Sequence, residues 1–447
     1  MRSRSASASL ILLLLACGGG SAPQPAAPPA WGAPATLDEA PSLDLGSLVA
    51  AERGPAALVW RRGVAATDGS LLPEVVIARI GAEGAWPSPA VLRPSQAGRV
   101  PGVPTAAVDR TGRGWVLWFE SFPPSGTTSV LAGAPLDLAA ATPWGPVDKA
   151  LMLPGNGFSG LQVAVGSEGS ARMAWQQGEG VSGVVATSAF DPGPGVWGAV
   201  SNPGGLGGAG MSTPRLAGDG GGGYVLELFR ANDQPIAEAH AYGPGAGPAQ
   251  AVPGWEPAAQ SAMASHRLAW AADGQGGLEA WLLYDLSAHP FREAWPRRRD
   301  ARGAWTVGEA VPLPRPAEAL AVFREASGAG WLAGSGAEGL WVAPLAGVTP
   351  GSATLLLPAP SLASDLIGIR DASGRPALLW VQRRNGGVEG IGFSRAVDGA
   401  WSAPGLLPGT AGAPVGHLRA AAAPGGLVAA WQETGDRTQR LRVARWR

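Results

Sequence analysis

Two series of tryptophans recur along the chain with nearly the same period, and this repeat constrains the fold more than any other feature. Each series advances in steps of roughly 53 residues, a spacing typical of repeat architectures. The first series ends the second apolar run of each unit and comprises Trp60, Trp118, Trp175, Trp281, Trp380 and Trp431. The second opens the fourth apolar run and comprises Trp31, Trp86, Trp144, Trp197, Trp305 and Trp401. In the units near Leu228 and Ala333, the tryptophan of the first series is missing from its expected position.

One complete unit lies between Val103 and Val147, where four short apolar runs alternate with turn residues. This pattern predicts a four-stranded antiparallel sheet. The 68 glycines and 42 prolines of the chain fall between such runs, so we interpret them as turns rather than disorder. Repeated four-stranded units predict an all-β fold, a β-propeller, although a linear array or two packed sandwiches would also use such units.

The two ends of the repeat favour a closed ring. In complete units the fourth-run tryptophan follows the second-run tryptophan by 21 to 26 residues, and this spacing counted from Trp431 extends past Arg447. Trp31, in contrast, opens a fourth run with no unit before it. Pairing the N-terminal strand into the last blade would satisfy both and leave no open sheet edge. We therefore expect about eight blades, or seven if the unit near Leu228 or Ala333 is incomplete.

Short turns join the first and second runs of the units, as at Asp109 to Gly112 and Asp371 to Gly374. Aspartate starts such turns by bonding its own backbone, and glycine supplies positive φ. A calcium loop needs alternating acidic ligands, which these turns lack. We therefore expect structural turns and no metal there.

The N-terminus predicts export and lipid attachment. Residues 1–16 combine Arg2 and Arg4 with an apolar run too short to span a bilayer, as in a secretory signal peptide. Leu14-Leu15-Ala16-Cys17 resembles the bacterial lipobox, which implies that Cys17 carries fatty acyl groups such as palmitate. An ordinary signal peptide with an incidental cysteine is the alternative, but Cys17 is the single cysteine of the chain.

The lipobox resemblance implies a bacterial cell-envelope location, with the protein attached to the membrane through Cys17. Gly18 provides no acidic retention signal after the cysteine, which favours the outer membrane over the inner. Residues 17–30 are rich in Gly, Pro and Ala and predict a disordered tether, and residues 31–447 form the predicted propeller domain.

Signatures of several enzyme classes are absent from the sequence. Lys149 is the single lysine and stands in no phosphate-binding loop. The four histidines, His240, His266, His289 and His417, are scattered without the spacing of metal ligands, so we expect neither metal nor cofactor. With 33 basic and 34 acidic residues the chain has no basic excess, and nucleic acid is not an expected partner.

Polar residues follow the second-run markers in at least seven units. In a propeller, the loops between second and third strands open on one face, and loops on a rigid scaffold concentrate binding residues. Simple solvation of hairpins that leave buried strands would give the same pattern. The predicted binding face consists of Arg61, Arg62, Glu120, Gln176, Gln177, Arg230, Asp285, Gln382, Arg383, Arg384, Gln432 and Glu433.

The blade layout loosely resembles sialidase-type propellers, and Asp109 to Gly112 with Trp115 is a distant form of their Asp-box. This resemblance implies carbohydrate hydrolysis as an alternative function. The lipid anchor and the eight blades resemble the propeller lipoprotein of the outer-membrane β-barrel assembly machinery. The sequence favours a lipid-anchored binding or scaffolding module with a protein or glycan ligand over an enzyme.

Overall fold

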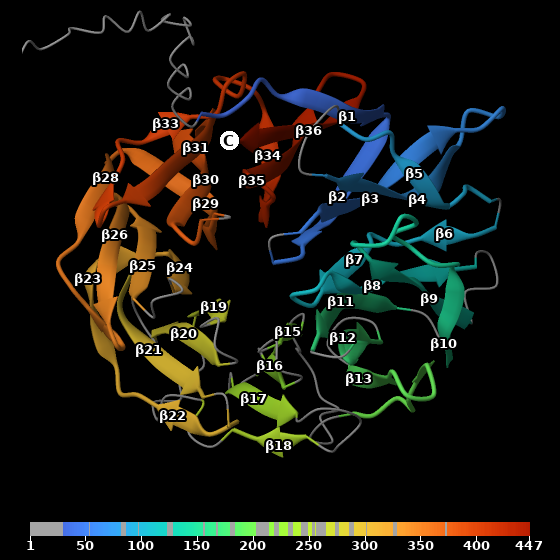
Figure 1. Cartoon of the computed structure of the whole chain (residues 1–447), viewed down its shortest axis with the longest axis horizontal. Helices are drawn as coiled ribbons and strands as arrows, with labels where there is room; N and C mark the ends of the chain where they lie inside the picture. The colour runs from blue at the N-terminus through green and yellow to red at the C-terminus, as the bar shows by residue number, and fades with distance from the viewer. Residues whose placement is uncertain are drawn as a thin grey trace, which may run out of the picture.

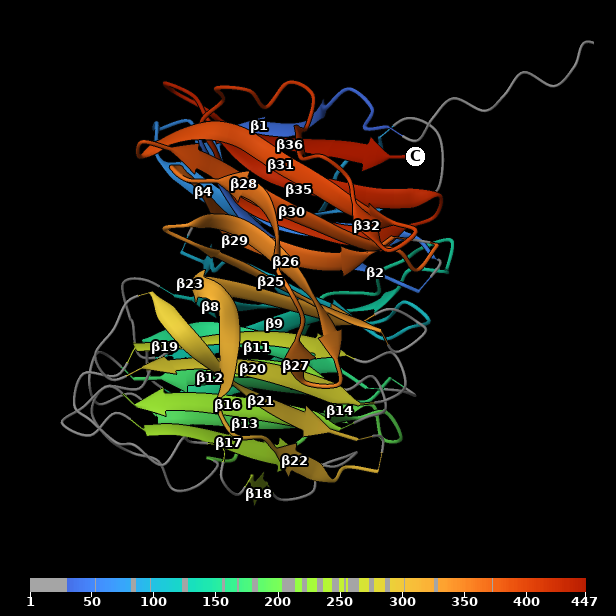
Figure 2. The same ribbon diagram turned by 90° about the vertical axis from the view of Figure 1, so that its left-hand side faces the viewer.

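The computed structural model describes residues 30–447 except for 53, 82–85, 97, 123–127, 155–156, 167–168, 179–183, 203–213, 219–222, 231–235, 243–248, 253–254, 256–264, 273–276, 286–289, 301, 325–328 and 372. These residues form an eight-bladed β-propeller, with sheets of four or five strands arranged around a central axis (Figure 1). Seen from the side, the strands of each blade run across the thickness of the ring (Figure 2). The predicted fold class is therefore confirmed.

Blades 1 to 4 follow one another along the chain. Their strands are β2 (Ser42–Ala50), β3 (Ala56–Ala65), β4 (Leu71–Ile80) and β5 (Ala90–Arg93) in blade 1; β6 (Val100–Pro101), β7 (Thr105–Val108), β8 (Arg113–Ser121), β9 (Thr128–Asp137) and β10 (Asp148–Pro154) in blade 2; β11 (Phe158–Val165), β12 (Ala171–Gln177), β13 (Val184–Asp191) and β14 (Val196–Trp197) in blade 3; and β15 (Arg215–Gly218), β16 (Tyr224–Arg230), β17 (Ile236–Tyr242) and β18 (Gln250–Ala251) in blade 4.

Blades 5 to 8 complete the ring, and in three of them the outermost strand is divided in two. Their strands are β19 (Ser265–Ala272), β20 (Leu278–Asp285), β21 (Phe291–Arg299), β22 (Trp305–Val307) and β23 (Val311–Ala317) in blade 5; β24 (Ala319–Arg324), β25 (Gly330–Gly336), β26 (Gly339–Ala346), β27 (Thr349–Pro350) and β28 (Thr354–Pro358) in blade 6; β29 (Ser361–Arg370), β30 (Pro376–Arg384), β31 (Gly387–Val397), β32 (Ala400–Trp401) and β33 (Gly405–Leu406) in blade 7; and β34 (Val415–Ala423), β35 (Gly426–Thr434), β36 (Gln439–Trp446) and β1 (Ala35–Ala40) in blade 8.

The ring closes through its first strand, as predicted. β1 pairs antiparallel with β36, and Trp31 forms an isolated bridge with Trp446. Ala30, which the sequence placed at the end of the tether, exchanges backbone hydrogen bonds with Arg447. The irregular units around Leu228 and Ala333 form blades 4 and 6, so the number of blades is eight and not seven.

The first tryptophan series occupies the second strands and fills the interfaces between blades. Trp118 on β8, for example, is fully buried and packs against Val59 and Ile77 of blade 1. The second series adds aromatic edge contacts across the same interfaces, with ring centroids of Trp197 and Trp115 5.4 Å apart. Large rings at each interface explain why both series share one period, since each blade must cover the same area of its predecessor.

Blade 6 fills its interface with a tryptophan and a glycine that have exchanged strands relative to blade 7. In blade 7, Trp380 on β30 lies opposite Gly392 on β31 and covers the space where a Cβ would stand. In blade 6, the tryptophan is Trp341 on β26 and the glycine is Gly334 on β25. Exchange of the two residues between strands explains the missing marker near Ala333.

Trp281 faces the following blade, whereas the other tryptophans of its series face the preceding one. It packs against Leu332 and Trp341 of blade 6, the following blade, whereas Ala280 faces blade 4. Because successive residues of a strand face opposite sides of the sheet, regular spacing in the sequence did not fix the side of the blade that Trp281 occupies.

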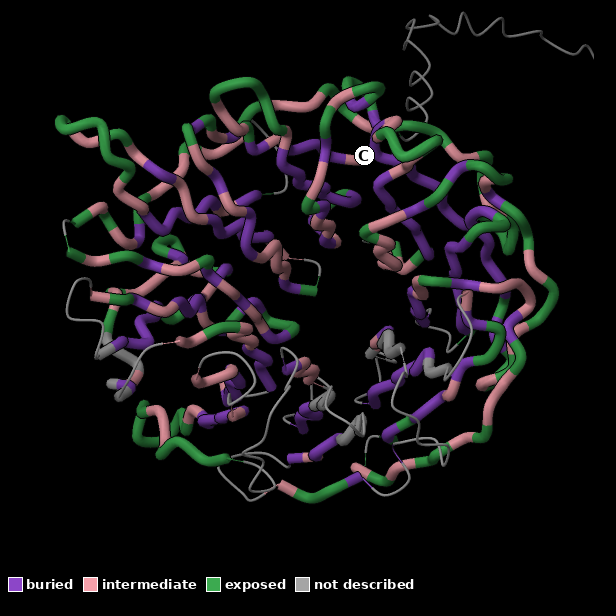
Figure 3. The backbone as a smooth tube through the Cα atoms, turned by 180° about the vertical axis from the view of Figure 1, so that it is seen from behind, coloured by how far each residue is buried: buried purple, intermediate pink, exposed green. Residues whose placement is uncertain are grey.

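The predicted turns are confirmed. Asp109 Oδ1 accepts hydrogen bonds from Thr111 N at 2.8 Å and from Arg113 N at 3.0 Å, and Gly112 adopts φ 93°. Asp371 makes the same contacts with Ser373 and Arg375. Buried stretches follow the strands, and exposed ones lie at turns and on the outer rim (Figure 3). Within the described ranges no helix is long and apolar enough to cross a membrane.

Candidate ligand-binding cleft

The predicted binding residues lie within the second strands, most of them near the strand ends, and not in the loops that follow. Arg61 and Arg62 belong to β3, Glu120 to β8, and Gln432 and Glu433 to β35. The same holds for Gln176 and Gln177 on β12, Arg230 on β16, Asp285 on β20, and Gln382, Arg383 and Arg384 on β30. The loop placement was wrong because the ladders continue past the buried tryptophans. Of Arg230 and Asp285, only the backbone belongs to the described part.

Several of these residues bind the buried indole groups. Trp118 Nε1 donates to Glu120 Oε1 at 3.0 Å, and Trp431 Nε1 donates to Glu433 Oε1 at 2.9 Å. A residue two positions after a tryptophan lies on the same face of the strand, which makes this contact possible. A buried N–H left without an acceptor would cost about 1–3 kcal/mol. The polar residue after the marker thus has a structural role in these blades.

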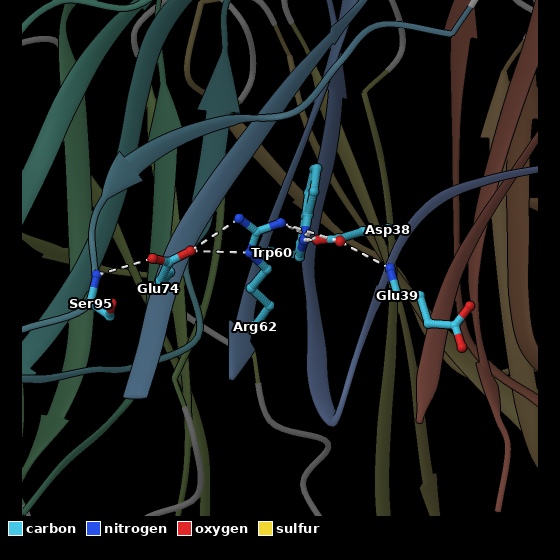
Figure 4. Close-up of polar contacts among 6 residues, drawn as sticks. All are labelled: Asp38, Glu39, Trp60, Arg62, Glu74 and Ser95. Atoms are coloured by element: carbon cyan, nitrogen blue, oxygen red, sulfur yellow. Dashed lines mark hydrogen bonds and ion pairs between the residues drawn. The ribbon is translucent and has the colours of Figure 1, made fainter. Parts of the chain in front are cut away.

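In blade 1 the acceptor for the buried indole comes from a different blade. Position 62 is an arginine, and Trp60 Nε1 donates instead to Asp38 Oδ2 on the closing strand β1 at 2.7 Å. Arg62 then joins Asp38, at 3.2 Å, to Glu74 on β4, at 3.1 Å (Figure 4). The closing strand is therefore held to blade 1 by a polar network as well as by its ladder to β36.

Further charged members of the predicted face are also bonded to their surroundings. Glu120 is 2% exposed and forms ion pairs with Arg93 on β5 of blade 1 and with Arg99, which precedes β6. Arg384 pairs with Glu389 at 3.2 Å, and Arg383 Nε donates to Ser364 Oγ. Most of the charge in this set therefore connects strands and blades.

A repeated irregularity marks the innermost strands of five consecutive blades. One extra residue bulges out of the ladder of β29 in blade 7, β34 in blade 8, β2 in blade 1 and β11 in blade 3. In blade 2 the inner strand is interrupted between β6 and β7, which both pair with β8. β15, β19 and β24 in blades 4 to 6 pair without such a shift. Bulges are frequent beside binding sites because they redirect side chains.

Adjacent bulges contact one another and form a continuous arc. Leu418 N in blade 8 donates to Asp365 Oδ2 in blade 7, and Arg419 Nε donates to Gly46 O in blade 1 at 3.0 Å. Ala106 N in blade 2 donates to Ser47 Oγ at 3.0 Å. The arc is therefore a connected structure and not a set of separate defects.

A cleft of about 790 Å³ lies along this arc, between blades 8, 1, 2 and 3. Its walls come mainly from inner strands that surround the centre of the ring (Figure 1). Of the predicted binding residues whose side chains the structure describes, Arg61 alone contributes to the walls. The lining residues are Leu45, Gly46, Ser47, Arg61, Val100, Pro101, Gly102, Val103, Pro104, Thr105, Phe119, Ser121, Ser129, Gly157, Phe158, Ser159, Gly160, Leu161, Gln162 and Arg419.

The chemistry of these walls suits binding. Arg61 and Arg419 are the ionisable lining residues, and Ser, Thr and Gln side chains supply neutral hydrogen-bonding groups. Phe119 and Phe158 form an apolar wall, with ring centroids 5.4 Å apart. Among the lining residues that the structure describes there is no carboxylate, whereas glycoside hydrolysis generally requires two across the bond. The described residues also contain no group of acidic, His and Cys side chains that could hold a metal.

The tryptophan repeat does not predict the cleft, although the sequence contains a signal for it. Gly46, Gly102, Gly160 and Gly416 each interrupt a first apolar run. An isolated glycine within a strand pattern indicates a bulge or a close backbone approach. The glycines were interpreted as part of the general abundance of turn residues, so the bulges were not predicted.

No known protein family matches the chain, and no curated protein matches its sequence. Among solved structures, it is similar to the polysaccharide lyase Uly1, with 10% identity, a TM-score of 0.44 and 90% of each chain covered. It is also similar to an intramolecular trans-sialidase from Ruminococcus gnavus, with 12% identity, a TM-score of 0.36, and 79% of this chain and 90% of that chain covered. A fucose-specific lectin from Aleuria aurantia has 11% identity and a TM-score of 0.31, with 71% and 95% covered.

Proposed function

We propose that this protein is a binding module of the bacterial cell envelope, anchored by lipid on Cys17, and that the cleft between blades 8, 1, 2 and 3 is its ligand site. The cleft carries this proposal because it combines concave shape, an apolar wall and several neutral polar groups in one place. Ligand sites in proteins generally have this composition. Cys17 lies outside the described residues, so its lipidation remains a prediction from the lipobox resemblance.

The geometry favours binding over hydrolysis. Asp44 pairs with the lining residue Arg61, and its carboxylate is committed to that ion pair. General acid and base catalysis needs titratable groups within reach of the substrate, and the described walls offer guanidinium groups alone. The walls are also fixed by inter-blade bonds, which suits a preformed recognition site.

A substitution that fills the cleft tests this function. Val103 lies between β6 and β7 and is 43% exposed, so a tryptophan there would occupy the cleft without entering the core. Val397 is 41% exposed at the end of β31 and does not line the cleft, which makes Val397→Trp the matched control.

The probes are an array of bacterial envelope oligosaccharides and a phage-displayed library of random hexapeptides. We expect the wild type and Val397→Trp to retain members of one of these sets, and Val103→Trp to lose them. Retention by Val103→Trp, or failure of the wild type to bind either set, would contradict the proposed function. Melting temperatures of the three proteins show whether the fold is preserved.

A further inference from the structure

Arg419 lines the cleft, and most of the N–H donors of its guanidinium have no acceptor among the contacts that follow. Its Nε donates to Gly46 O at 3.0 Å, and its Nη1 donates to Leu418 O at 2.9 Å. A guanidinium has five N–H donors, so these two bonds use fewer than half of them. Both acceptors are backbone carbonyls, which orient the side chain but do not neutralise its charge.

Arg61, the other arginine in the cleft, is already paired with a carboxylate. Its Nη2 lies 2.6 Å from Asp44 Oδ2, its Nε bonds the same oxygen, and its Nη1 donates to Pro101 O. Among the described residues, no carboxylate forms an ion pair with Arg419. The cleft therefore contains one neutralised arginine and one whose charge has no direct partner.

Burial of Arg419 increases the effect of an anion bound beside it. Desolvation lowers the pKa of Arg419 below its ordinary value, and the negative charge of Asp365 offsets this only in part. A partly desolvated guanidinium interacts strongly with an ionised acceptor, because the local dielectric constant is low. The site thus favours a ligand that brings one negative charge.

The apolar wall indicates the class of molecule that carries this charge. Phe119 and Phe158 are tilted by 33° and pack on each other, so each ring covers part of the other's face. Leu45, Val103 and Leu161 continue the wall. Such a surface of ring edges and aliphatic groups matches an apolar side chain better than the flat face of a sugar, which stacks on an open aromatic ring.

We propose that the cleft binds a polypeptide segment in which Arg419 receives a carboxylate and the wall of Phe158, Val103 and Leu161 receives a neighbouring apolar side chain. This inference rests on the proposed function of the cleft and adds the class of its ligand.

A pair of isosteric substitutions tests the charge without altering Arg419. Val103→Asp places a carboxylate on the wall, and Val103→Asn places a neutral group of the same size there. Because Val103 is exposed, neither substitution disturbs the core. We expect the hexapeptides selected by the wild type to contain Asp or Glu next to an apolar residue. Affinity for them should fall about 10- to 100-fold in Val103→Asp relative to Val103→Asn, as expected for a charge introduced beside a bound carboxylate.

Arg419→Met tests the arginine itself, with Arg383→Met as the control at an arginine outside the cleft. The selected peptides should lose about 10- to 100-fold in affinity with Arg419→Met alone, the range of a charge-assisted hydrogen bond to a ligand. A melting temperature for each variant separates loss of the site from loss of the fold.

Several results would overturn the inference. Selected peptides without acidic residues, or equal binding by Val103→Asp and Val103→Asn, would exclude recognition of a carboxylate. Binding of oligosaccharides but not of peptides, abolished by Val103→Trp, would exclude the peptide while preserving the proposed function of the cleft. Loss of both classes of binding with Val397→Trp as well would contradict the cleft itself as the ligand site.

Discussion

Trp60 in blade 1 donates its indole N–H to Asp38 on the closing strand of blade 8, with 2.7 Å between Nε1 and Oδ2. Arg62 binds the same carboxylate from the neighbouring position of the strand face. The seam of the ring therefore depends on a charge contact between the first strand of the chain and the blade that follows it. The backbone ladder between β1 and β36 and this side-chain contact thus hold the same strand in place.

Replacement of Asp38 by alanine should destabilise the ring strongly. It leaves the buried indole of Trp60 without an acceptor and Arg62 with Glu74 as its remaining partner. Removal of one member of a partly buried charge network costs about 3–5 kcal/mol at most, and the partial exposure of Arg62 reduces this to about 2–3 kcal/mol. Urea unfolding of the purified protein measures the change.

Asp44→Ala is the matched control for that experiment. Asp44 also pairs with an arginine of β3, but both side chains are substantially exposed, at 30% and 43%. Exposed ion pairs contribute about 0–1 kcal/mol, so the unfolding midpoint should shift little. An equal loss of stability in Asp38→Ala and Asp44→Ala would show that the seam contact has no special role.

A second buried contact connects blades 5 and 6. Glu279 accepts from Trp281 Nε1 at 2.6 Å and pairs with Arg324 at 2.7 Å, and both charged side chains are nearly inaccessible. Glu279→Gln keeps the shape but leaves the charge of Arg324 uncompensated, which should cost about 3 kcal/mol or more. Glu338→Gln breaks the exposed pair with Arg315 and should have little effect. Similar melting temperatures of the two variants would contradict this account.

The apolar runs were sufficient to predict four strands per blade, the two tryptophan series predicted the closure of the ring, and the Asp and Gly residues between runs predicted the turns. The partners of the polar groups were not predictable in the same way. Glu120 stands two residues from Trp118, so the alternation of a strand explains their contact, but Asp38 reaches Trp60 from another blade. Trp281 kept the spacing of its series while facing the opposite side, because period alone does not fix which face of the strand a residue occupies.

The cleft escaped prediction for a related reason. A bulge adds one residue to a strand without changing the average length of the unit, so it leaves the period of the repeat intact. Gly46 was visible in the sequence, but its significance depends on Pro104 of the next blade, whose carbonyl occupies the space where a Cβ would stand. Contacts between neighbouring blades can be recognised only when the ring is assembled.

Gly46→Ala tests the importance of that bulge. The added methyl group would collide with the carbonyl oxygens of Pro104 and Val59, and both are backbone atoms that cannot rotate away. We expect a loss of about 1–3 kcal/mol, as for other overpacked sites, together with weaker ligand binding. Gly416→Ala is the control in the bulge of blade 8, because its Cβ would meet no atom within 4 Å. Equal stability of the two variants would contradict the structural role of the arc.

Cys17→Ala tests the anchor. The substitution removes the thiol that receives the lipid, so the protein should lose fatty-acid labelling and leave the membrane fraction. Immunoblots of membrane and soluble fractions, with radiolabelled palmitate as the probe, measure both effects. Ser21→Ala in the same segment should change neither. Unaltered labelling in Cys17→Ala would disprove the lipobox interpretation.

Two truncations test ring closure as a whole. Deletion of residues 18–28 removes only predicted tether and should leave the melting temperature unchanged. Deletion of residues 18–41 also removes β1, which deprives β36 of its outer partner and Trp60 of Asp38.

The longer truncation should therefore exceed the effect of Asp38→Ala, because it removes a complete ladder in addition to the charge contact. An unpaired β36 would present a free strand edge, and such edges promote association between molecules. We expect a lower melting temperature and concentration-dependent aggregation, measured by differential scanning calorimetry and light scattering. A synthetic peptide of residues 30–41 added to the truncated protein should restore part of the stability if the seam is an ordinary strand pairing. Identical behaviour of the two truncations would show that β1 does not hold the ring closed.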